Sequence, residues 1–237
     1  MISVDLHLHT CYSYDCATPL SDVVRGCRRA GLDCVAITDH NTISGALRLR
    51  DEGEFRVIVG EEISTTHGEL LGFFLNKPVP RGLSPQETIG RIKEQGGLVC
   101  MPHPLGRKPY RSKGNMGSSQ DGRFLPSSGL LHANRLLTED VLAALDLIEV
   151  INCRTPFAST WASMRRLAEM CGLPQTAGSD AHTQGEIGHA RVVMPDFHDA
   201  ASFLEGVRSA ELSGTRSSAS VHFASMYAKL RRRRCSD

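Results

Sequence analysis

Short apolar segments alternate along this chain with stretches of helical periodicity. The apolar segments cover residues 2–8, 34–38, 56–60, 69–75, 98–102, 145–151 and 173–177. Their length and composition predict buried β-strands, and the helical patterns between them predict repeated βα units. Such units favour a parallel sheet covered by helices, and about seven of them favour a closed or nearly closed barrel.

Three of the predicted helices have recognisable ends. The first follows Thr18, which we expect to cap it, and stops at Gly31. The second starts with Ser84 and Glu87, which together form a capping box. The third covers residues 159–172 and ends on a glycine.

Two segments depart from this alternation. Residues 104–137 are rich in Gly and Ser, lack a clear period, and carry six basic residues against one acidic residue, a net charge of +5. A loop this long in a compact domain is usually functional or disordered, and we favour function. Residues 221–237 are predicted to form a short helix that runs into a basic C-terminal tail.

Composition sets the limits of this interpretation. The chain has 237 residues, of which 41% are hydrophobic, so we treat residues 1–237 as a single domain with a sizeable core. A net charge of +1 excludes a protein that binds polyanions through its overall charge. The eight cysteines form no C-x-x-C pair, so we expect reduced thiols in a cytoplasmic protein. We expect neither a signal peptide nor a membrane span, since no apolar run approaches roughly 18 residues.

Polar residues follow nearly every predicted strand. In chain order they are His7, His9 and Asp15; Asp39 and His40; Glu61 and Glu62; His67 and Glu69; His103; Asn152 and Arg154; and Asp180 and His182. In a parallel α/β fold the carboxyl ends of the strands meet at one end of the sheet, where the chemistry gathers. Each residue alone is a weak signal, but imidazole or carboxylate at six or more strand ends is an improbable accident.

Converging carboxylates and imidazoles need a counterion. Without one they repel each other or lose hydrogen bonds, and bound divalent metal removes that conflict. The donors are nitrogen and oxygen without cysteine, which excludes a structural zinc–thiolate site and suits zinc, manganese or iron in an open catalytic site. Eight or more donors exceed the needs of one ion, so we expect two or three, which could clamp the oxygens of a phosphoryl transfer.

Five ordered motifs carry a resemblance to a known family. They read HLHT-CYSYD, ITDHNT, GEEI, MPHP and GSDAH. In order and spacing they resemble the PHP domain, the polymerase and histidinol phosphatase superfamily, over residues 1–190. The resemblance implies a distorted (β/α)7 barrel, similar to a TIM barrel, with a trinuclear metal centre at its strand ends.

The resemblance also implies which residues hold the ions. His7, His9, Glu62 and Asp180 would hold the first ion, Glu62 would bridge to a second ion shared with His103, and Asp15, His40 and His182 would hold the third. Glu61 would be solvated or lie behind the ligands, and Asp39 would orient an imidazole.

The chain departs from the family at two of these positions. Asp15 stands where many members have histidine, and its oxygen slightly favours manganese or iron. Glu69 stands where the family often has a histidine ligand, while His67 lies two residues earlier on the same strand face. We favour Glu69 as the ligand.

Cations near the predicted ligands indicate a phosphate group in the substrate. The candidate substrate-binding residues are Arg107, Lys108, Arg111 and Arg154. Arginine presents a fork of donors that suits phosphate oxygens. We therefore predict hydrolysis of a small phosphate monoester through a metal-bridging hydroxide, with His40 or His182 protonating the leaving oxygen where metal does not hold them.

Three other functions stay open at this point. A nuclease or phosphodiesterase on short single-stranded nucleic acid could use the basic tail, although a solvated terminus explains that tail more simply. A non-catalytic metal-binding interaction module is disfavoured by the nearly complete ligand set. A hydrolase of C–N bonds is disfavoured by the basic loop.

Overall fold

The fold is known from a computed structural model that describes residues 1–105, 135–155, 158–218, 221 and 225–226. Its strands are β1 (Ile2–Leu8), β2 (Cys34–Ile37), β3 (Arg56–Ser64), β4 (Glu69–Phe73), β5 (Leu98–Met101), β6 (Leu147–Asn152), β7 (Gln175–Gly178), β8 (Ala190–Met194) and β9 (Glu211–Gly214). Its helices are α1 (Leu20–Ala30), α2 (Ser44–Glu52), α3 (Pro85–Lys93), α4 (Glu139–Ala144), α5 (Ala158–Cys171) and α6 (Ala200–Val207), and a short 3₁₀ helix covers Gln184–Glu186.

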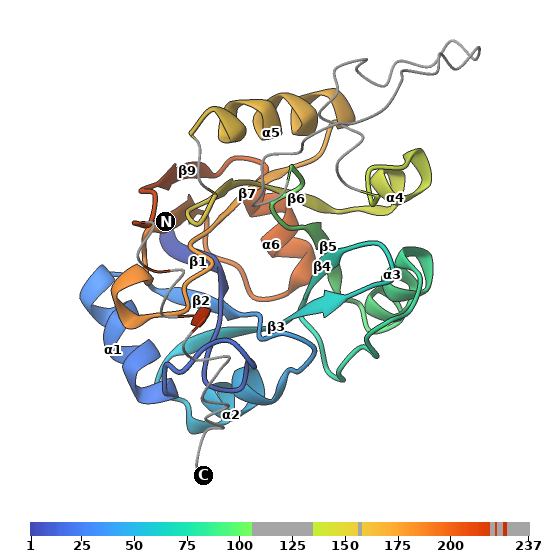
Figure 1. Cartoon of the computed structure of the whole chain (residues 1–237). Helices are drawn as coiled ribbons and strands as arrows, with labels where there is room; N and C mark the ends of the chain where they lie inside the picture. The colour runs from blue at the N-terminus through green and yellow to red at the C-terminus, as the bar shows by residue number, and fades with distance from the viewer. Residues whose placement is uncertain (106–134, 156–157, 219–220, 222–224, 227–237) are drawn as a thin grey trace, which may run out of the picture.

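The strands form one sheet that curls into a nearly closed barrel. Their order is β7-β6-β5-β4-β3-β2-β1-β8-β9. The barrel closes where the segment after β7 meets β1: the amide of Asp180 donates to the carbonyl of His7 at 2.7 Å, and the amide of His9 donates to that of Ala181 at 2.9 Å. Helices α1 to α5 surround the barrel (Figure 1). The predicted α/β barrel is confirmed.

Two strands, β4 and β8, run against both of their neighbours, which corrects the expectation of a wholly parallel sheet. β4 pairs antiparallel with both β3 and β5. Only residues 65–68 separate β3 from β4, and a parallel crossover needs about a dozen residues or more. The reversal brings Glu69, the first residue of β4, opposite Ser64 at the end of β3.

The helix ends match the sequence pattern except at one position. Ser84 and Glu87 form the predicted capping box of α3, and Gly31 ends α1 in the left-handed conformation at φ 65°. Thr18 does not cap α1, because Pro19 occupies the N-cap position. The Thr18 hydroxyl donates instead to the carbonyl of His182 at 3.1 Å, which ties the loop after β1 to the loop after β7.

The cysteines are mostly buried thiols, as expected. Six of those in the described part of the chain are free: Cys16, Cys27, Cys34, Cys100, Cys153 and Cys171. Cys11 is disulfide-bonded, so the expectation of reduced thiols is wrong for that residue. Among the described residues, no helix is both long enough and apolar enough to cross a membrane.

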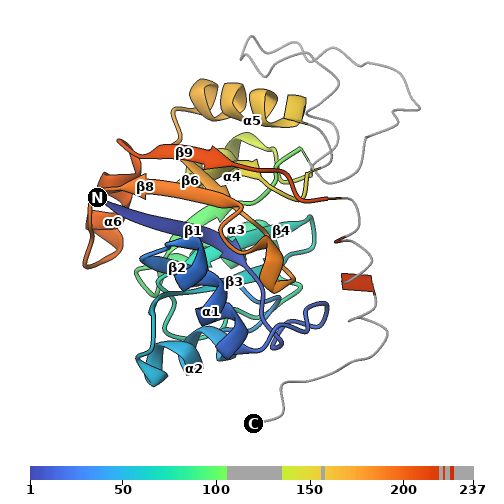
Figure 2. The same cartoon turned by 90° about the vertical axis from the view of Figure 1, so that its left-hand side faces the viewer.

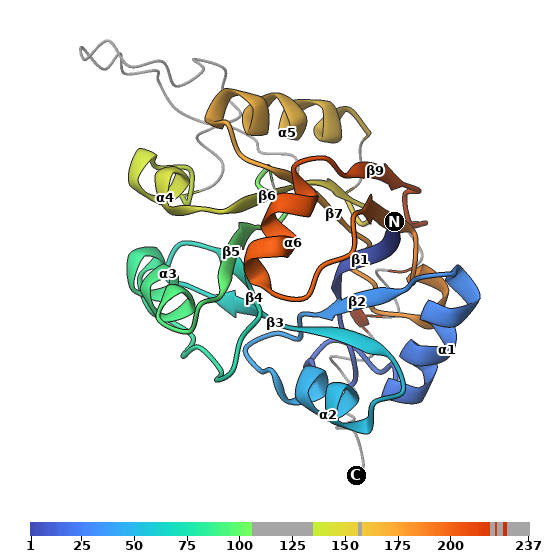
Figure 3. The same ribbon diagram turned by 180° about the vertical axis from the view of Figure 1, so that it is seen from behind.

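Helix α6 covers the end of the barrel at which β1 begins (Figures 2 and 3). Phe203 of this helix is fully buried, and its ring centroid lies 5.1 Å from that of Phe197, 5.3 Å from that of Phe74 and 6.4 Å from that of Phe73. Tilted and edge-to-face pairs of this kind stabilise a core beyond the area they bury. Apolar packing thus fills this end, and polar side chains gather at the other.

Replacing Phe203 with Ala should lower the free energy of unfolding by about 3–5 kcal/mol, because it leaves a cavity among the three other rings. Urea denaturation followed by circular dichroism measures the loss. Glu205→Ala, on the exposed side of the same helix, should change stability by less than about 0.5 kcal/mol. Equal effects of the two substitutions would show that α6 does not seal the barrel.

Candidate metal centre

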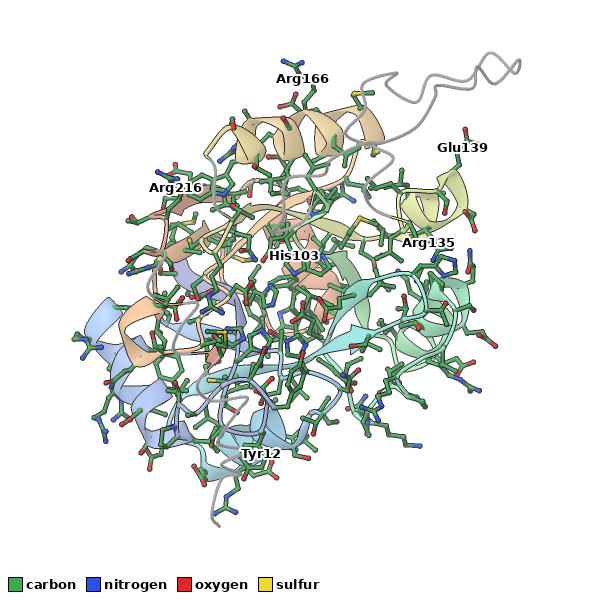
Figure 4. The ribbon with its side chains drawn as sticks, in the orientation of Figure 1. Tyr12, His103, Arg135, Glu139, Arg166 and Arg216 are labelled. Carbon is green, nitrogen blue, oxygen red and sulfur yellow. The ribbon has the colours of Figure 1, made fainter. Side chains whose placement is uncertain are left out.

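The nine predicted ligands come together at the end of the barrel formed by the carboxyl ends of the parallel strands. We call this group the rim cluster; its members are His7, His9, Asp15, His40, Glu62, Glu69, His103, Asp180 and His182. Three sets within it have donor atoms that all lie within 4.8 Å of one another: His9, Asp15, His40 and His182; His7, His9 and Glu62; and His40, Glu62 and Glu69. Figure 4 shows His103 near the middle of the ring of strands.

Strand alternation decides which side chains of β1 and β3 reach the rim cluster. His7 and His9 are separated by one residue, so both point to the same side, and their Nε2 atoms lie 3.2 Å apart. Glu62 points to the same interior, where it is fully buried. Glu61 points the other way and accepts a hydrogen bond from the amide of Val79 at 2.8 Å. Glu61 is therefore buried behind the sheet and is not solvated.

The carboxylate of Glu62 lies at the centre of the rim cluster. Its Oε2 is 3.4 Å from Nε2 of His7, 3.2 Å from Nε2 of His9 and 3.2 Å from Nδ1 of His40. Its Oε1 is 3.2 Å from Nε2 of His103. Burial alone would raise the pKa of Glu62, but the imidazoles of His40 and His7 hold it well below its usual value. One carboxylate that faces four imidazoles has the arrangement of a bridging ligand.

Asp15 makes a second focus of contacts. Its Oδ2 is 3.2 Å from Nε2 of His182 and 3.4 Å from Nε2 of His40. Burial would raise the pKa of Asp15, but these two imidazoles hold it far below its usual range. Burial, together with the nearby His9, lowers the pKa of His182 to about 3.

Two members of the rim cluster have backbone conformations that L-residues rarely adopt. His103 has φ 29° and Asp180 has φ 54°. Such conformations cost about 1–3 kcal/mol each and persist only where the surroundings enforce them. Strained residues of this kind concentrate at functional sites, and both of these residues are predicted metal ligands.

The donor set fits divalent cations. Nδ1 of His40 and Nε2 of His182 are buried and lie 3.2 Å from carboxylate oxygens, but neither makes a well-directed hydrogen bond to a described residue. Burial lowers the pKa of His7 and His9, but nearby carboxylates outweigh it, raising the pKa of His9 to about 9 and that of His7 well above its usual value. Without metal, protons on these imidazoles compensate the negative charge of the carboxylates. A divalent ion can replace protons on such ligands.

Strand β4 brings Glu69, and not His67, to the rim cluster. Oε1 of Glu69 lies 3.5 Å from Nδ1 of His40, inside the rim cluster. His67 lies in the turn before β4, is exposed, and has Nδ1 2.8 Å from Oγ1 of Thr66. The structure brings Glu69 to the other candidates and leaves His67 outside.

Asp39 does not orient an imidazole, which corrects the expectation. Its Oδ1 accepts from the amide of Thr10 at 2.6 Å and its Oδ2 accepts from the hydroxyl of Thr10 at 2.7 Å. Asp39 therefore holds the backbone of the loop between His9 and Asp15.

Of the four predicted substrate-binding residues, the structure describes only Arg154. Arg107, Lys108 and Arg111 lie outside the described residues. Arg154 is buried, with Nε 3.0 Å from Oε1 of Glu186 and with Nη2 donating at 2.9 Å to the carbonyl of Val221 and to the hydroxyl of Ser225. Oε2 of Glu186 accepts from the amide of His182 at 3.1 Å. In this structure Arg154 contacts its own chain, and its role toward substrate stays a prediction.

Sequence reasoning missed an acidic residue that contacts two members of the rim cluster. Glu149 lies within β6 and is 1% exposed, and its Oε1 lies 3.0 Å from Nδ1 of His7. Its only signal is an acidic residue inside the apolar run of residues 145–151. The neighbouring Asn152 donates to Oε2 of Glu149 at 3.0 Å and to Oδ2 of Asp180 at 3.2 Å.

Comparisons with known sequences agree with this geometry. Residues 5–99 match the family model described as the PHP domain, and residues 163–212 match the model described as PHP-associated. An uncharacterized protein of Methanocaldococcus jannaschii is 44% identical over 116 residues, which span 44% of this chain and 68% of that protein.

Solved structures share the fold. A two-domain protein of Bacteroides vulgatus, described as containing a predicted PHP-like metal-dependent phosphoesterase, has a TM-score of 0.65 and 17% identity over 90% of this chain and 65% of its own. A lesion-specific endonuclease of Pyrococcus furiosus has a TM-score of 0.53 and 13% identity over 89% of this chain and 57% of its own. This chain therefore spans less than two thirds of either protein.

Replacing Arg154 with Met should lower the free energy of unfolding by about 3–5 kcal/mol, because it leaves the buried carboxylate of Glu186 without its cation. Urea denaturation measures the change. Arg166→Met removes an outward-pointing arginine from α5 (Figure 4) and should be nearly neutral. If Arg154→Met keeps wild-type stability and only raises KM, the predicted substrate role holds and the structural one is wrong.

Proposed function

This chain belongs to the PHP domain family, and we propose that it is a metal-dependent phosphoesterase that hydrolyses a small phosphate monoester. One observation carries the proposal: eight imidazole and carboxylate residues gather with the buried carboxylate of Glu62, and together they are carried on six strands or on the segments that follow them. Such a group of buried polar side chains is costly in an apolar core, but its nitrogen and oxygen atoms are suitable ligands for divalent cations. The relative described as a phosphoesterase domain supports the reaction class.

We assign the rim cluster to two or three divalent ions of manganese, iron or zinc. Glu62 would be shared between ions, with His7, His9 and Asp180 on one side and His103 on the other; Asp15, His40 and His182 would hold a third. Glu69 would join His40 and Glu62. Such ions, when bound, supply Lewis acidity to phosphoryl oxygens and lower the pKa of water toward neutrality.

Hydrogen bonding separates the two candidate proton donors. Nδ1 of His182 lies 2.8 Å from the carbonyl of Asp180, which only accepts, so this nitrogen carries the proton. Nε2 of the neutral ring then offers a lone pair, and His182 suits a ligand better than an acid. His40 is the more exposed of the two, at 7% against 3%, and where no ion holds it, it would protonate the leaving oxygen.

Phosphate release tests the reaction. Wild-type protein loaded with Mn²⁺, Fe²⁺ or Zn²⁺ should release phosphate from a panel of monoesters, and chelation should abolish the release. His9→Ala should lower kcat/KM at least about 100-fold, because loss of a mere supporting partner of a ligand already costs about 10- to 100-fold. His67→Ala, an exposed histidine outside the rim cluster, should be neutral. Absence of phosphate release with every metal, on monoesters and short oligonucleotides alike, would contradict the proposal.

A second candidate is a phosphodiesterase or nuclease that acts on nucleotides or short single-stranded nucleic acid. Tyr14 favours it: this residue is 58% exposed, and its ring stacks on that of His40 with centroids 4.9 Å apart. An exposed aromatic ring beside the rim cluster offers a surface on which a base could stack, which contributes about 1–3 kcal/mol per base. The similarity to an endonuclease fold is consistent with this alternative.

Tyr14→Ala separates the two candidates. If the substrate carries a base, this substitution should raise KM for it about 5- to 100-fold while KM for glycerol phosphate stays unchanged. Tyr14→Phe keeps the ring and should behave as wild type on both. Equal kinetics of Tyr14→Ala and wild type on nucleotides would argue against base stacking and leave the small monoester as the substrate.

A further inference from the structure

Glu149 contacts two residues of the rim cluster without belonging to it. Its Oε1 lies 3.0 Å from Nδ1 of His7, and its Oε2 accepts from the backbone amide of His103 at 2.8 Å. The same Oε2 accepts from Nδ2 of Asn152 at 3.0 Å. Both oxygens are thus engaged by donors, so this buried carboxylate is arranged to hold neighbours in place.

The contact with His7 fixes the orientation of that ring. Because the carboxylate of Glu149 accepts, Nδ1 of His7 carries the proton and Nε2 points toward Glu62 at 3.4 Å and His9 at 3.2 Å. A carboxylate behind an imidazole in this way sets its tautomer and raises its basicity as a ligand.

The contact with His103 stabilises a strained backbone. At φ 29° this residue lies outside the favoured regions, and a charge-assisted hydrogen bond from its amide to Glu149 offsets part of that cost. The strained conformation directs Nε2 of His103 to within 3.2 Å of Oε1 of Glu62. One carboxylate therefore positions imidazoles on both sides of Glu62.

Gly178 gives independent evidence of how closely Glu149 and His7 are packed, because any side chain at position 178 would collide with both residues. A Cβ at this position of β7 would lie 2.3 Å from Oε1 of Glu149 and 2.3 Å from Cβ of His7. The conformation of Gly178 does not itself require glycine, since its φ is not positive. The steric requirement comes from the two side chains that meet in front of it.

We propose that Glu149 is a positioning residue that orients His7 and His103 toward the ions held around Glu62, and that Gly178 provides the room for it. This inference rests on the proposed metal-dependent function. In this role Glu149 would not itself bind an ion.

The test is the metal affinity of Glu149→Gln. The amide oxygen of Gln can still accept from His7, but its NH₂ group then faces the amide of His103 and Nδ2 of Asn152, which are also donors. Titration calorimetry with Mn²⁺ and Zn²⁺ should show about 10- to 100-fold weaker binding than wild type. Glu61→Gln is the matched control, because its one hydrogen bond from Val79 survives, and its affinity should stay within about twofold.

Gly178→Ala provides a second route to the same defect with Glu149 intact, and it should also weaken metal binding about 10-fold or more. In ¹⁵N spectra of the Zn²⁺-loaded protein, the Nδ1 signal of His7 should shift in Glu149→Gln and stay unchanged in Glu61→Gln. A purely structural role would lower the melting temperature without moving that signal or the affinity.

The outcomes separate the two proposals. Wild-type affinity and an unmoved His7 signal in Glu149→Gln, with wild type binding metal normally, would overturn the positioning role alone. A wild-type protein that takes up no divalent ion would overturn the proposed function and this inference together. Should Glu149→Gln fail to fold, unchanged affinity in Gly178→Ala would overturn the positioning role.

Discussion

The structure depends on one electrostatic constraint: the fully buried carboxylate of Glu62 faces imidazole nitrogens of four histidines, His7, His9, His40 and His103. A carboxylate in an apolar interior is costly unless positive charge and hydrogen bonds compensate it. Protonated histidines meet that need without metal, at the cost of placing several cations together. Divalent ions meet it better, because one ion satisfies several lone pairs at once. The polar end of the barrel is therefore built to hold cations, while the other end is filled by the aromatic cluster around Phe203.

Much of this could be read from the sequence, and the reasons are local. Each predicted strand overlaps an observed one, because short apolar runs between helical patterns have few other conformations in a barrel. The inward direction of His7, His9 and Glu62 follows from the two-residue repeat of a strand. The reversal of β4 was also readable, since the eight residues between the predicted strands 56–60 and 69–75 are fewer than the dozen or so that a parallel crossover needs. The elements α2, α4, α6, β8 and β9 were not predicted. Helix α2 is as long as the predicted α3, but it lacks the capping box that marks the start of α3.

The roles of individual charged residues were harder to foresee. An arginine after a strand has the same sequence signature whether it faces substrate or, like Arg154, a buried carboxylate from a distant segment. Glu149 gave no periodic signal, because its partners His7 and His103 lie 142 and 46 residues away along the chain. Such roles are set by tertiary contacts, and only the folded chain reveals them.

Four buried carboxylates around the rim cluster have one role in common: each accepts a hydrogen bond from a backbone amide in a loop that carries a predicted ligand. Asp5 accepts from the amide of Ser179, Asp39 from that of Thr10, Glu149 from that of His103 and Glu186 from that of His182. Each amide lies at or beside a ligand that follows β1, β5 or β7, where the backbone has left the sheet and has lost its regular partners. A carboxylate that satisfies such an amide fixes the position of the ligand and also adds negative charge behind it. The same four bonds thus help to shape the site and bias it toward cations.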